Sequence, residues 1–127
     1  MPKRVLVADD SSITRKLLNK ALTAAGYEVE TAEDGFIALE KLIRFKYDLL
    51  ISDMNMPSMN GMELITRIRD EIDMQNLPII VLTSVEGEEQ SKLAIEAGAN
   101  LYVQKPVKDE IFVKKIQNLL KMVHQNE

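Results

Sequence analysis

Polar side chains that could perform chemistry stand directly after short apolar runs of this sequence. Asp9 and Asp10 follow the first run, Asp53 the third, Thr83 the fourth and Lys105 the fifth. If these runs are neighbouring strands, three carboxylates meet at one edge of a sheet. Two such charges 4 Å apart repel by roughly 4 kcal/mol at an effective dielectric of about 20. The cluster therefore requires a cation.

The available ligands define which cation that is. The chain has no cysteine, and its one histidine, His124, is a tail residue expected to lie in solvent. The ligands are then all oxygen, which favours Mg²⁺, with Mn²⁺ as the alternative. Such an ion keeps coordination positions open for water and phosphoryl oxygens, while Lys105 adds a positive group and Thr83 a hydroxyl donor. The set predicts a phosphoryl site in which one carboxylate is the nucleophile.

The elements that must position these residues alternate regularly along the chain. Strand-like runs occupy 5–8, 28–32, 48–52, 78–82 and 101–104, and helical patterns occupy 11–25, 36–45, 62–72, 87–97 and 108–123. Strands separated by helices pair in parallel, and runs of successive apolar residues indicate burial on both faces. The second run alternates, which places it at an edge. These patterns predict an α/β fold, a doubly wound parallel sheet between two layers of helices, with ligands at the carboxyl ends of its strands.

Helical periodicity also predicts which residues face the core. In the first helix the apolar stripe comprises Ile13, Leu17, Ala21, Leu22 and Ala25. In the last helix it comprises Ile111, Phe112, Ile116, Leu119, Leu120 and Val123.

Composition excludes several classes of protein. The 127 residues carry a net charge of −4, 46% are hydrophobic and 28% are charged, as in a globular protein of one domain. A mildly acidic chain with 5% aromatic residues is a poor nucleic-acid binder. No apolar run approaches the roughly 20 residues of a membrane helix, and the amino terminus does not read as a signal peptide. We expect a cytoplasmic protein that contacts neither membrane nor nucleic acid directly.

Four segments carry a resemblance to a known family. They are VLVADDSSITRKLL, YDLLISDMNMPSMNGMELI, PIIVLTS and AGANLYVQKP, which occur in order between residues 5 and 106. Together they resemble the receiver domain of two-component response regulators, of the CheY-like type. The resemblance implies a single receiver domain over residues 1–127, with a (βα)₅ three-layer sandwich and a flavodoxin-like strand order, 2-1-3-4-5.

The resemblance also implies roles for the acidic residues. Asp53 would be the phosphoacceptor and become an aspartyl-phosphate. Asp10 and Asp53 would bind Mg²⁺ directly, together with the backbone carbonyl of Asn55. Asp9 would act mainly through a bound water.

A second group of residues would transmit the signal. Lys105 would pair with the phosphoryl oxygens, and its peptide bond to Pro106 would be cis. Thr83 would move toward the phosphoryl group, and Tyr102 would turn inward as it does so. The face built by the fourth helix, fifth strand and fifth helix would thereby change its affinity for a partner.

The function implied is a phosphorylation-activated switch rather than an enzyme with a separate substrate. A histidine kinase or a histidine phosphotransfer protein would donate the phosphoryl group, and a downstream target protein would receive the signal. The chain would catalyse its own phosphoryl transfer and dephosphorylation. We expect a monomer, with dimerisation on phosphorylation as the alternative.

Other interpretations exist for each feature. Asp9 and Asp10 could simply begin a helix, Thr83 could cap one, Lys105 could belong to a surface turn, and Tyr102 could only pack. The methionines around Asp53 could fill space in the loop or contact a partner.

Other classes of protein are less consistent with the residues. A haloacid-dehalogenase-like phosphatase requires a second acid where Asn55 stands, and a flavodoxin-like electron carrier requires a hydroxyl-rich loop after the first strand. The chain could also be the receiver part of a longer transcription factor, although its Met1 and polar end favour a stand-alone domain.

Overall fold

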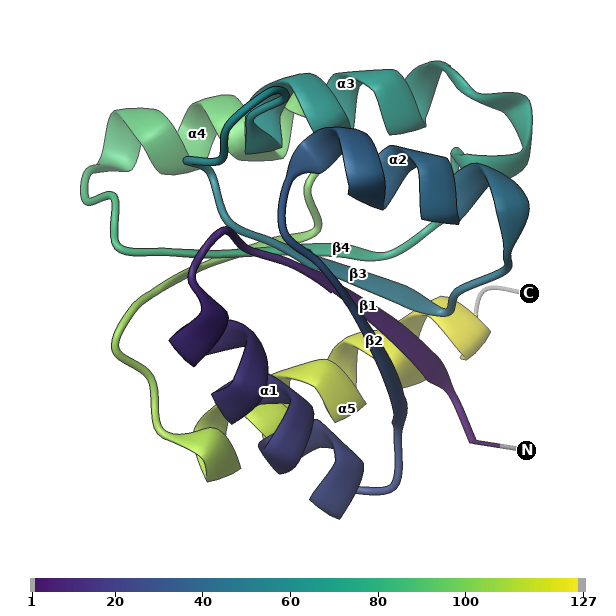
Figure 1. The fold of residues 1–127 in the computed structure, drawn as a ribbon, viewed down its shortest axis with the longest axis vertical. Coiled ribbons are helices and arrows are strands. Elements are labelled where there is room, and N and C mark those ends of the chain that lie inside the picture. The colour runs from purple at the N-terminus through teal and green to yellow at the C-terminus, as the bar shows by residue number, and fades with distance from the viewer. Residues whose placement is uncertain (1, 126–127) are drawn as a thin grey trace.

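The computed structural model describes residues 2–125 and contains alternating strands and helices (Figure 1). The strands are β1 (Arg4–Ala8), β2 (Glu28–Ala32), β3 (Leu49–Ser52), β4 (Ile79–Thr83) and β5 (Leu101–Gln104). The helices are α1 (Ser12–Ala24), α2 (Gly35–Arg44), α3 (Gly61–Asp70), α4 (Glu88–Ala97) and α5 (Asp109–Gln125), with a 3₁₀ turn at Ile72–Met74. The predicted helix over 62–72 therefore ends earlier than expected, because the chain tightens into that turn.

The strands form one parallel sheet in the order β2-β1-β3-β4-β5. This confirms the predicted fold class and the edge position of β2. The carboxyl ends of the strands lie together on the left of Figure 1, while both ends of the chain lie on the right. Side chains that follow different strands are thus gathered at one edge.

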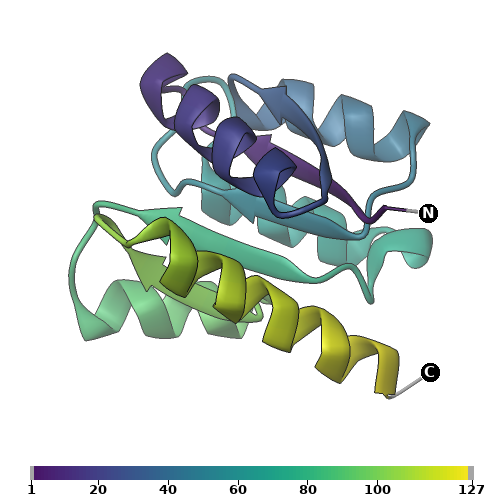
Figure 2. The same ribbon diagram turned by 90° about the horizontal axis from the view of Figure 1, so that it is seen from below.

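Helices cover both faces of the sheet. α1 and α5 lie side by side on one face, and α2, α3 and α4 cover the other (Figures 1 and 2). β1 supplies both cores, because Val5 and Val7 pack with α1 and α5 while Leu6 and Ala8 pack with α2 and α3. All four residues are buried, as the run of successive apolar residues predicted.

The predicted core face of α1 was wrong in part. Leu18 and Leu22 are buried, whereas Ile13 and Leu17 are 70% and 62% exposed. Because Leu17 and Leu18 are about 100° apart around the helix, two neighbouring stripes fit the same periodicity, and the packing of α1 on β1 selects the stripe with Leu18. For the same reason Ile111 of α5 is exposed rather than in the core.

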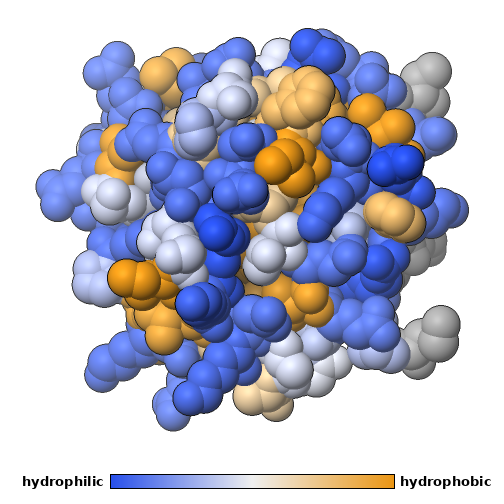
Figure 3. Space-filling view, viewed as in Figure 1, coloured by the Kyte–Doolittle hydropathy of each residue, from blue (hydrophilic) through white to orange (hydrophobic). Residues whose placement is uncertain are grey.

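A mostly polar surface is expected when the apolar residues of the strands are buried. The side of the molecule seen in Figure 3 is largely hydrophilic, with separate apolar spots. None of the helices among the described residues is long and apolar enough to cross a membrane.

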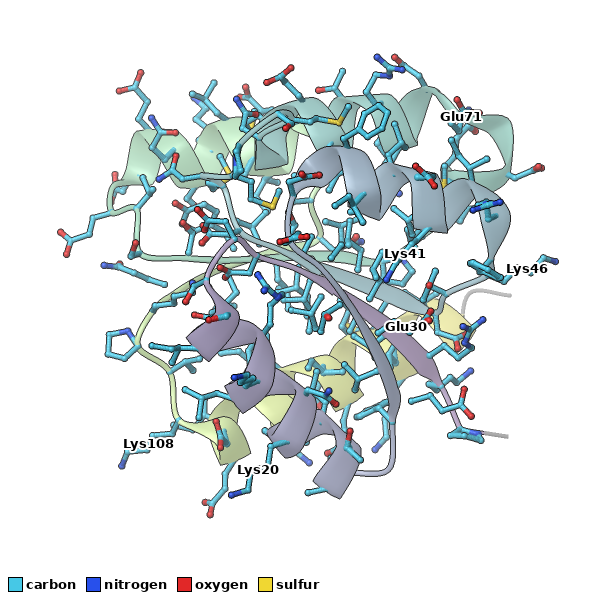
Figure 4. The ribbon with its side chains drawn as sticks, in the orientation of Figure 1. Lys20, Glu30, Lys41, Lys46, Glu71 and Lys108 are labelled. Carbon is cyan, nitrogen blue, oxygen red and sulfur yellow. The ribbon has the colours of Figure 1, made fainter. Side chains whose placement is uncertain are left out.

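A polar network closes the end of the sheet opposite to the carboxyl edge. The Arg4 guanidinium lies 3.1 Å from Glu30 Oε2 and stacks over the Tyr47 ring, whose hydroxyl donates to Glu30. Burial, together with the negative charge of Glu30, raises the pKa of Tyr47. Figure 4 shows Glu30 and Lys46 toward this end and Lys108 toward the other. A cavity of about 460 Å³ also opens here, between the loop after α2 and the end of α5.

Candidate metal centre

Three carboxylates converge at the carboxyl edge of the sheet. Asp9, Asp10 and Asp53 each offer an oxygen, and these oxygens all lie within 4.8 Å of one another. Asp9 and Asp10 follow β1 and Asp53 follows β3, which is its direct neighbour in the sheet. Asp9 and Asp53 are 2% and 8% exposed, whereas Asp10 is exposed. The convergence expected from the sequence is therefore present.

Asp9 is the most firmly held of the three. Its Oδ2 accepts from Lys105 Nζ at 2.9 Å, and its Oδ1 accepts from the Ser11 N–H at 2.9 Å. Burial raises the pKa of Asp9, and the charge of Asp53 raises it further, while the contacts with Lys105 and Ser11 act in the opposite direction. The net effect is a carboxyl whose pKa lies above its usual value, because ionisation places a charge in a poorly solvated position.

Lys105 bridges two acids from different strands. Its ammonium lies 2.9 Å from Asp9 Oδ2 and 3.2 Å from Asp53 Oδ2. Burial acts to lower the pKa of Lys105, but the hydrogen bond to Asp9 and the charge of Asp53 outweigh it, so the pKa is raised. The peptide between Lys105 and Pro106 is cis, as the resemblance implied.

The loop after β3 wraps around the Asp53 carboxylate. Its Oδ1 accepts from the Met54 N–H at 2.6 Å and from the Asn55 N–H at 3.4 Å. The Gly61 N–H donates to Met54 O at 2.9 Å, which closes the loop on itself. The first two methionines of the loop, Met54 and Met56, are buried and pack in the core. This agrees with the hypothesis that methionines near Asp53 fill space in the loop.

Thr83 and Tyr102 both contact Val85. The buried Thr83 hydroxyl accepts from the Val85 N–H at 3.3 Å, and the Tyr102 hydroxyl donates to Val85 O at 2.8 Å. The residue before α4 is Gly87, and that position provides no side-chain cap, so Thr83 does not cap the helix. Burial raises the pKa of Tyr102, and the charge of Asp53 adds to the rise.

One residue at this site, Arg15, was not predicted from the sequence. Arg15 in α1 places Nη1 2.7 Å from the backbone carbonyl oxygen of Asp9. Its backbone N–H donates to Ser11 O, so Arg15 stands one helical turn after the cap of α1. A sequence signal for Arg15 does exist. The helix begins beside two acids, and Arg15 is a cation one turn into it. The side chain of His124 lies outside the described residues.

The donor set fits a small, hard divalent cation. Its side-chain ligands are oxygens on three acids, and the ammonium of Lys105 is one positive charge against three carboxylates. Two of the three acids are buried, where their repulsion is poorly screened. An oxygen-coordinated Mg²⁺ would offset that repulsion.

Comparison with known proteins agrees with this geometry. Residues 5–117 match the family of response regulator receiver domains. Chemotaxis protein CheY1 of Helicobacter pylori (strain ATCC 700392 / 26695) is 37% identical over 119 residues, which are 92% of this chain and 96% of that protein.

Solved structures of receiver domains are similar to this protein over almost the whole chain. A CheY-like receiver domain protein of Methanospirillum hungatei JF-1 has a TM-score of 0.94 at 28% identity, covering 100% of both chains. The receiver domain of sensor histidine kinase PA1611 of Pseudomonas aeruginosa PAO1, with a magnesium ion coordinated in its active site cleft, has a TM-score of 0.88 at 25% identity. It covers 95% of this chain and 99% of that one.

Fold, acidic cluster and comparisons define one class of protein. The chain belongs to the response regulator receiver domain family. Within that family it is CheY-like, a phosphorylation-activated response regulator of a two-component system.

Proposed function

We propose that Asp53 accepts a phosphoryl group from the phosphohistidine of a histidine kinase or of a histidine phosphotransfer protein. The observation that carries the proposal is the position of the Lys105 ammonium, 2.9 Å from Asp9 and 3.2 Å from Asp53, beside three converging carboxylates. In this proposal residues 1–127 act as one receiver domain, a monomer in its unphosphorylated form. The cytoplasmic location expected from the sequence stays a prediction.

The transfer needs only one bond made and one broken. A carboxylate oxygen of Asp53 attacks phosphorus, so an O–P bond forms while the P–N bond to the donor imidazole breaks. The imidazole leaves with the electron pair of that bond and takes a proton from solvent. Lys105 stands beside the phosphoryl oxygens and offsets their charge, and the Met54 N–H holds the acceptor carboxylate in its orientation. Attack of water on the aspartyl-phosphate would later restore Asp53 and release phosphate.

The acidic cluster would hold Mg²⁺, or Mn²⁺ in its place. Asp10, Asp53 and the backbone carbonyl of Asn55 would be direct ligands, with Asp9 acting through a water. The bound ion would supply charge stabilisation for the phosphoryl oxygens. The 4.8 Å grouping of the three carboxylates supports this assignment, as does the magnesium ion in the PA1611 receiver domain.

The output would pass through Thr83 and Tyr102 to the face built by α4, β5 and α5. A phosphoryl group on Asp53 adds about −1.5 to −2 charge and offers new acceptor oxygens. The Thr83 hydroxyl would turn toward them, and Tyr102 would occupy the space that it leaves. Both arrangements exist without phosphorylation, and the phosphoryl group shifts their populations. A downstream protein that prefers one arrangement then gains or loses affinity.

A small phosphodonor tests the proposal directly. Acetyl phosphate with Mg²⁺ is expected to add one phosphoryl group to the wild-type chain, as observed by intact mass spectrometry. Asp53→Asn is expected to remain unmodified, while the exposed Asp70→Asn, at the end of α3, reacts like the wild type. Equal modification of Asp53→Asn would refute the assignment of the acceptor. The same preparations, treated with beryllium fluoride and used as bait, would identify partners that prefer the activated form.

A further inference from the structure

Arg15 contacts the backbone between the two amino-terminal acids of the site. Its Nη1 donates to the carbonyl oxygen of Asp9, at 2.7 Å. That oxygen belongs to the peptide group that joins Asp9 to Asp10. A hydrogen bond from a charged guanidinium is about twice as strong as a neutral one, so this contact resists rotation of the peptide.

With Arg15, every polar atom of Asp9 has a hydrogen-bond partner. The Asp9 N–H donates to Ala32 O at 3.0 Å, and the two carboxylate oxygens accept from Ser11 and Lys105. The carbonyl oxygen is the remaining polar atom, and Arg15 is its donor. A network in which every group has a partner keeps one geometry.

Asp10 has no comparable support of its own. It is exposed, and no hydrogen bond or ion pair holds its carboxylate in the part of the chain that the structure describes. The backbone that carries Asp10 therefore sets the position from which its side chain can reach the cluster. If the Asp9–Asp10 peptide rotates, the Asp10 carboxylate turns away from Asp53, and the oxygens no longer converge.

We propose that Arg15 is a positioning residue, which fixes the Asp9–Asp10 peptide and thereby aims the Asp10 carboxylate into the metal centre. The inference rests on the proposed function, because it assumes that Asp10 is a ligand of Mg²⁺. It assigns to α1 a part in building the metal centre that is separate from its packing against the sheet.

Electrostatics alone predicts the opposite consequence for metal binding. Arg15 is a cation beside the site of a cation, so removing its charge without any other change would strengthen Mg²⁺ binding. Loss of a positioning contact would weaken it, since residues that orient metal ligands typically contribute about 10-fold to 100-fold in affinity. The sign of the change therefore separates the two roles.

The neighbouring residue provides a matched control. Lys16 carries the same charge on the same helix, but it is exposed and makes no hydrogen bond to Asp9 in the described part of the chain. Lys20, one turn further along α1, also points into solvent (Figure 4). Lys16→Ala thus removes a charge near the site without touching the Asp9–Asp10 peptide.

The experiment is a calorimetric titration of Mg²⁺ into wild type, Arg15→Ala, Arg15→Lys, Lys16→Ala and Asp10→Asn. We expect Arg15→Ala to raise the Kd about 10-fold, Arg15→Lys to recover part of the loss, and Lys16→Ala to leave the Kd unchanged or lower. A Kd for Arg15→Ala equal to or below that of wild type would overturn the inference. If Arg15→Ala does not fold, Arg15→Lys decides, because a wild-type Kd there would show that only charge matters.

A second measurement separates this inference from the proposed function. In metal-free protein, ¹⁵N relaxation of the Asp10 amide is expected to show greater mobility in Arg15→Ala than in wild type or Lys16→Ala. Unchanged relaxation would overturn the positioning role of Arg15. Failure of wild type to bind Mg²⁺, or equal binding by Asp10→Asn, would instead overturn the proposed metal centre, and the relaxation data would still decide whether Arg15 holds Asp10.

Discussion

Thr83 and Tyr102 are joined through a single residue. The Val85 N–H donates to the Thr83 hydroxyl at 3.3 Å, and the Val85 carbonyl accepts from the Tyr102 hydroxyl at 2.8 Å. If Thr83 turns toward a phosphoryl group on Asp53, it gives up the bond from Val85, to which Tyr102 is also attached. The loop between β4 and α4 therefore links the two side chains.

Removing the Tyr102 hydroxyl is expected to break this link. Tyr102→Phe loses the bond to Val85 O, which should lower the free energy of unfolding by about 1 kcal/mol. Acetyl phosphate should still modify Asp53, since Tyr102 does not contact it. The change in the Val85 amide chemical shift on addition of beryllium fluoride should shrink, whereas Tyr27→Phe, just before β2, should preserve it. An unaltered Val85 response in Tyr102→Phe would show that the link carries no signal.

Lys105→Ala is expected to destabilise the metal-free protein. Without the ammonium, Asp9 and Asp53 face each other without a counter-charge. The free energy of unfolding at pH 7 should fall by about 1–3 kcal/mol, less than for a fully buried pair because Lys105 is partly exposed. Mg²⁺ should still bind and restore much of this loss, but phosphorylation should no longer raise partner affinity. Urea unfolding with and without Mg²⁺ measures the first effect, with Lys108→Ala as control.

The contrary outcome concerns a partner captured in the beryllium fluoride experiment. If phosphorylation still raises the affinity of Lys105→Ala for that partner, then Lys105 does not couple phosphorylation to partner binding.

Asp9→Asn should show a stability that depends on pH in a defined direction. The pKa of Asp9 is raised in the folded state, so folding favours its protonated form. The stability contributed by that proton is fully present below the unfolded pKa of about 3.9 and is lost as pH rises through the folded pKa. Asn cannot ionise, so the stability of Asp9→Asn relative to wild type should increase as pH rises through the folded pKa of Asp9.

Urea unfolding in a chelator across pH 3–8 measures this difference. Wild type and Asp9→Asn should converge at the acidic end of the range. A wild type that becomes the more stable of the two with rising pH would mean that the contact with Lys105 outweighs burial.

Gly61→Ala should disturb the acceptor loop. A Cβ at Gly61 would lie 2.3 Å from the carbonyl oxygen of Asp53 and 2.9 Å from Met54 Cα, both backbone atoms that cannot move independently. Overpacking of this kind costs typically about 1–3 kcal/mol, and it should also slow phosphorylation by acetyl phosphate. Ala38→Gly, which weakens α2 in the core instead, serves as a control of similar stability loss. Equal phosphorylation rates in the two variants would count against a role for this contact in the reaction.

Mg²⁺ should stabilise the wild-type fold. A ligand that binds only the folded state adds about 2.7 kcal/mol at 100 times its Kd, here by relieving repulsion among the three carboxylates. The melting temperature should therefore rise with Mg²⁺ and level off near saturation, and the rise should be smaller in Asp10→Asn. A melting temperature that does not respond to millimolar Mg²⁺ would argue against the metal centre.

The alternation of strands and helices, and the residues at the strand ends, could be predicted from local sequence patterns. Successive apolar residues such as Val5 and Leu6 require burial on both faces, and crossover helices require parallel strands. Parallel strands place all their carboxyl ends at one edge, so Asp9, Asp53 and Lys105 had to approach one another. That part follows from local periodicity and chain direction.

Two features depend instead on how the folded chain packs: which side of α1 faces the sheet, and which side chains bind one another. Leu18 is buried and Leu17 exposed because α1 docks at one rotation among two that its sequence permits. The bond from Tyr102 to Val85 and the bond from Arg15 to Asp9 depend on side-chain directions set by strand register and helix docking. Sequence periodicity carries no information at that scale, since a rotation of 100° separates neighbouring residues of a helix.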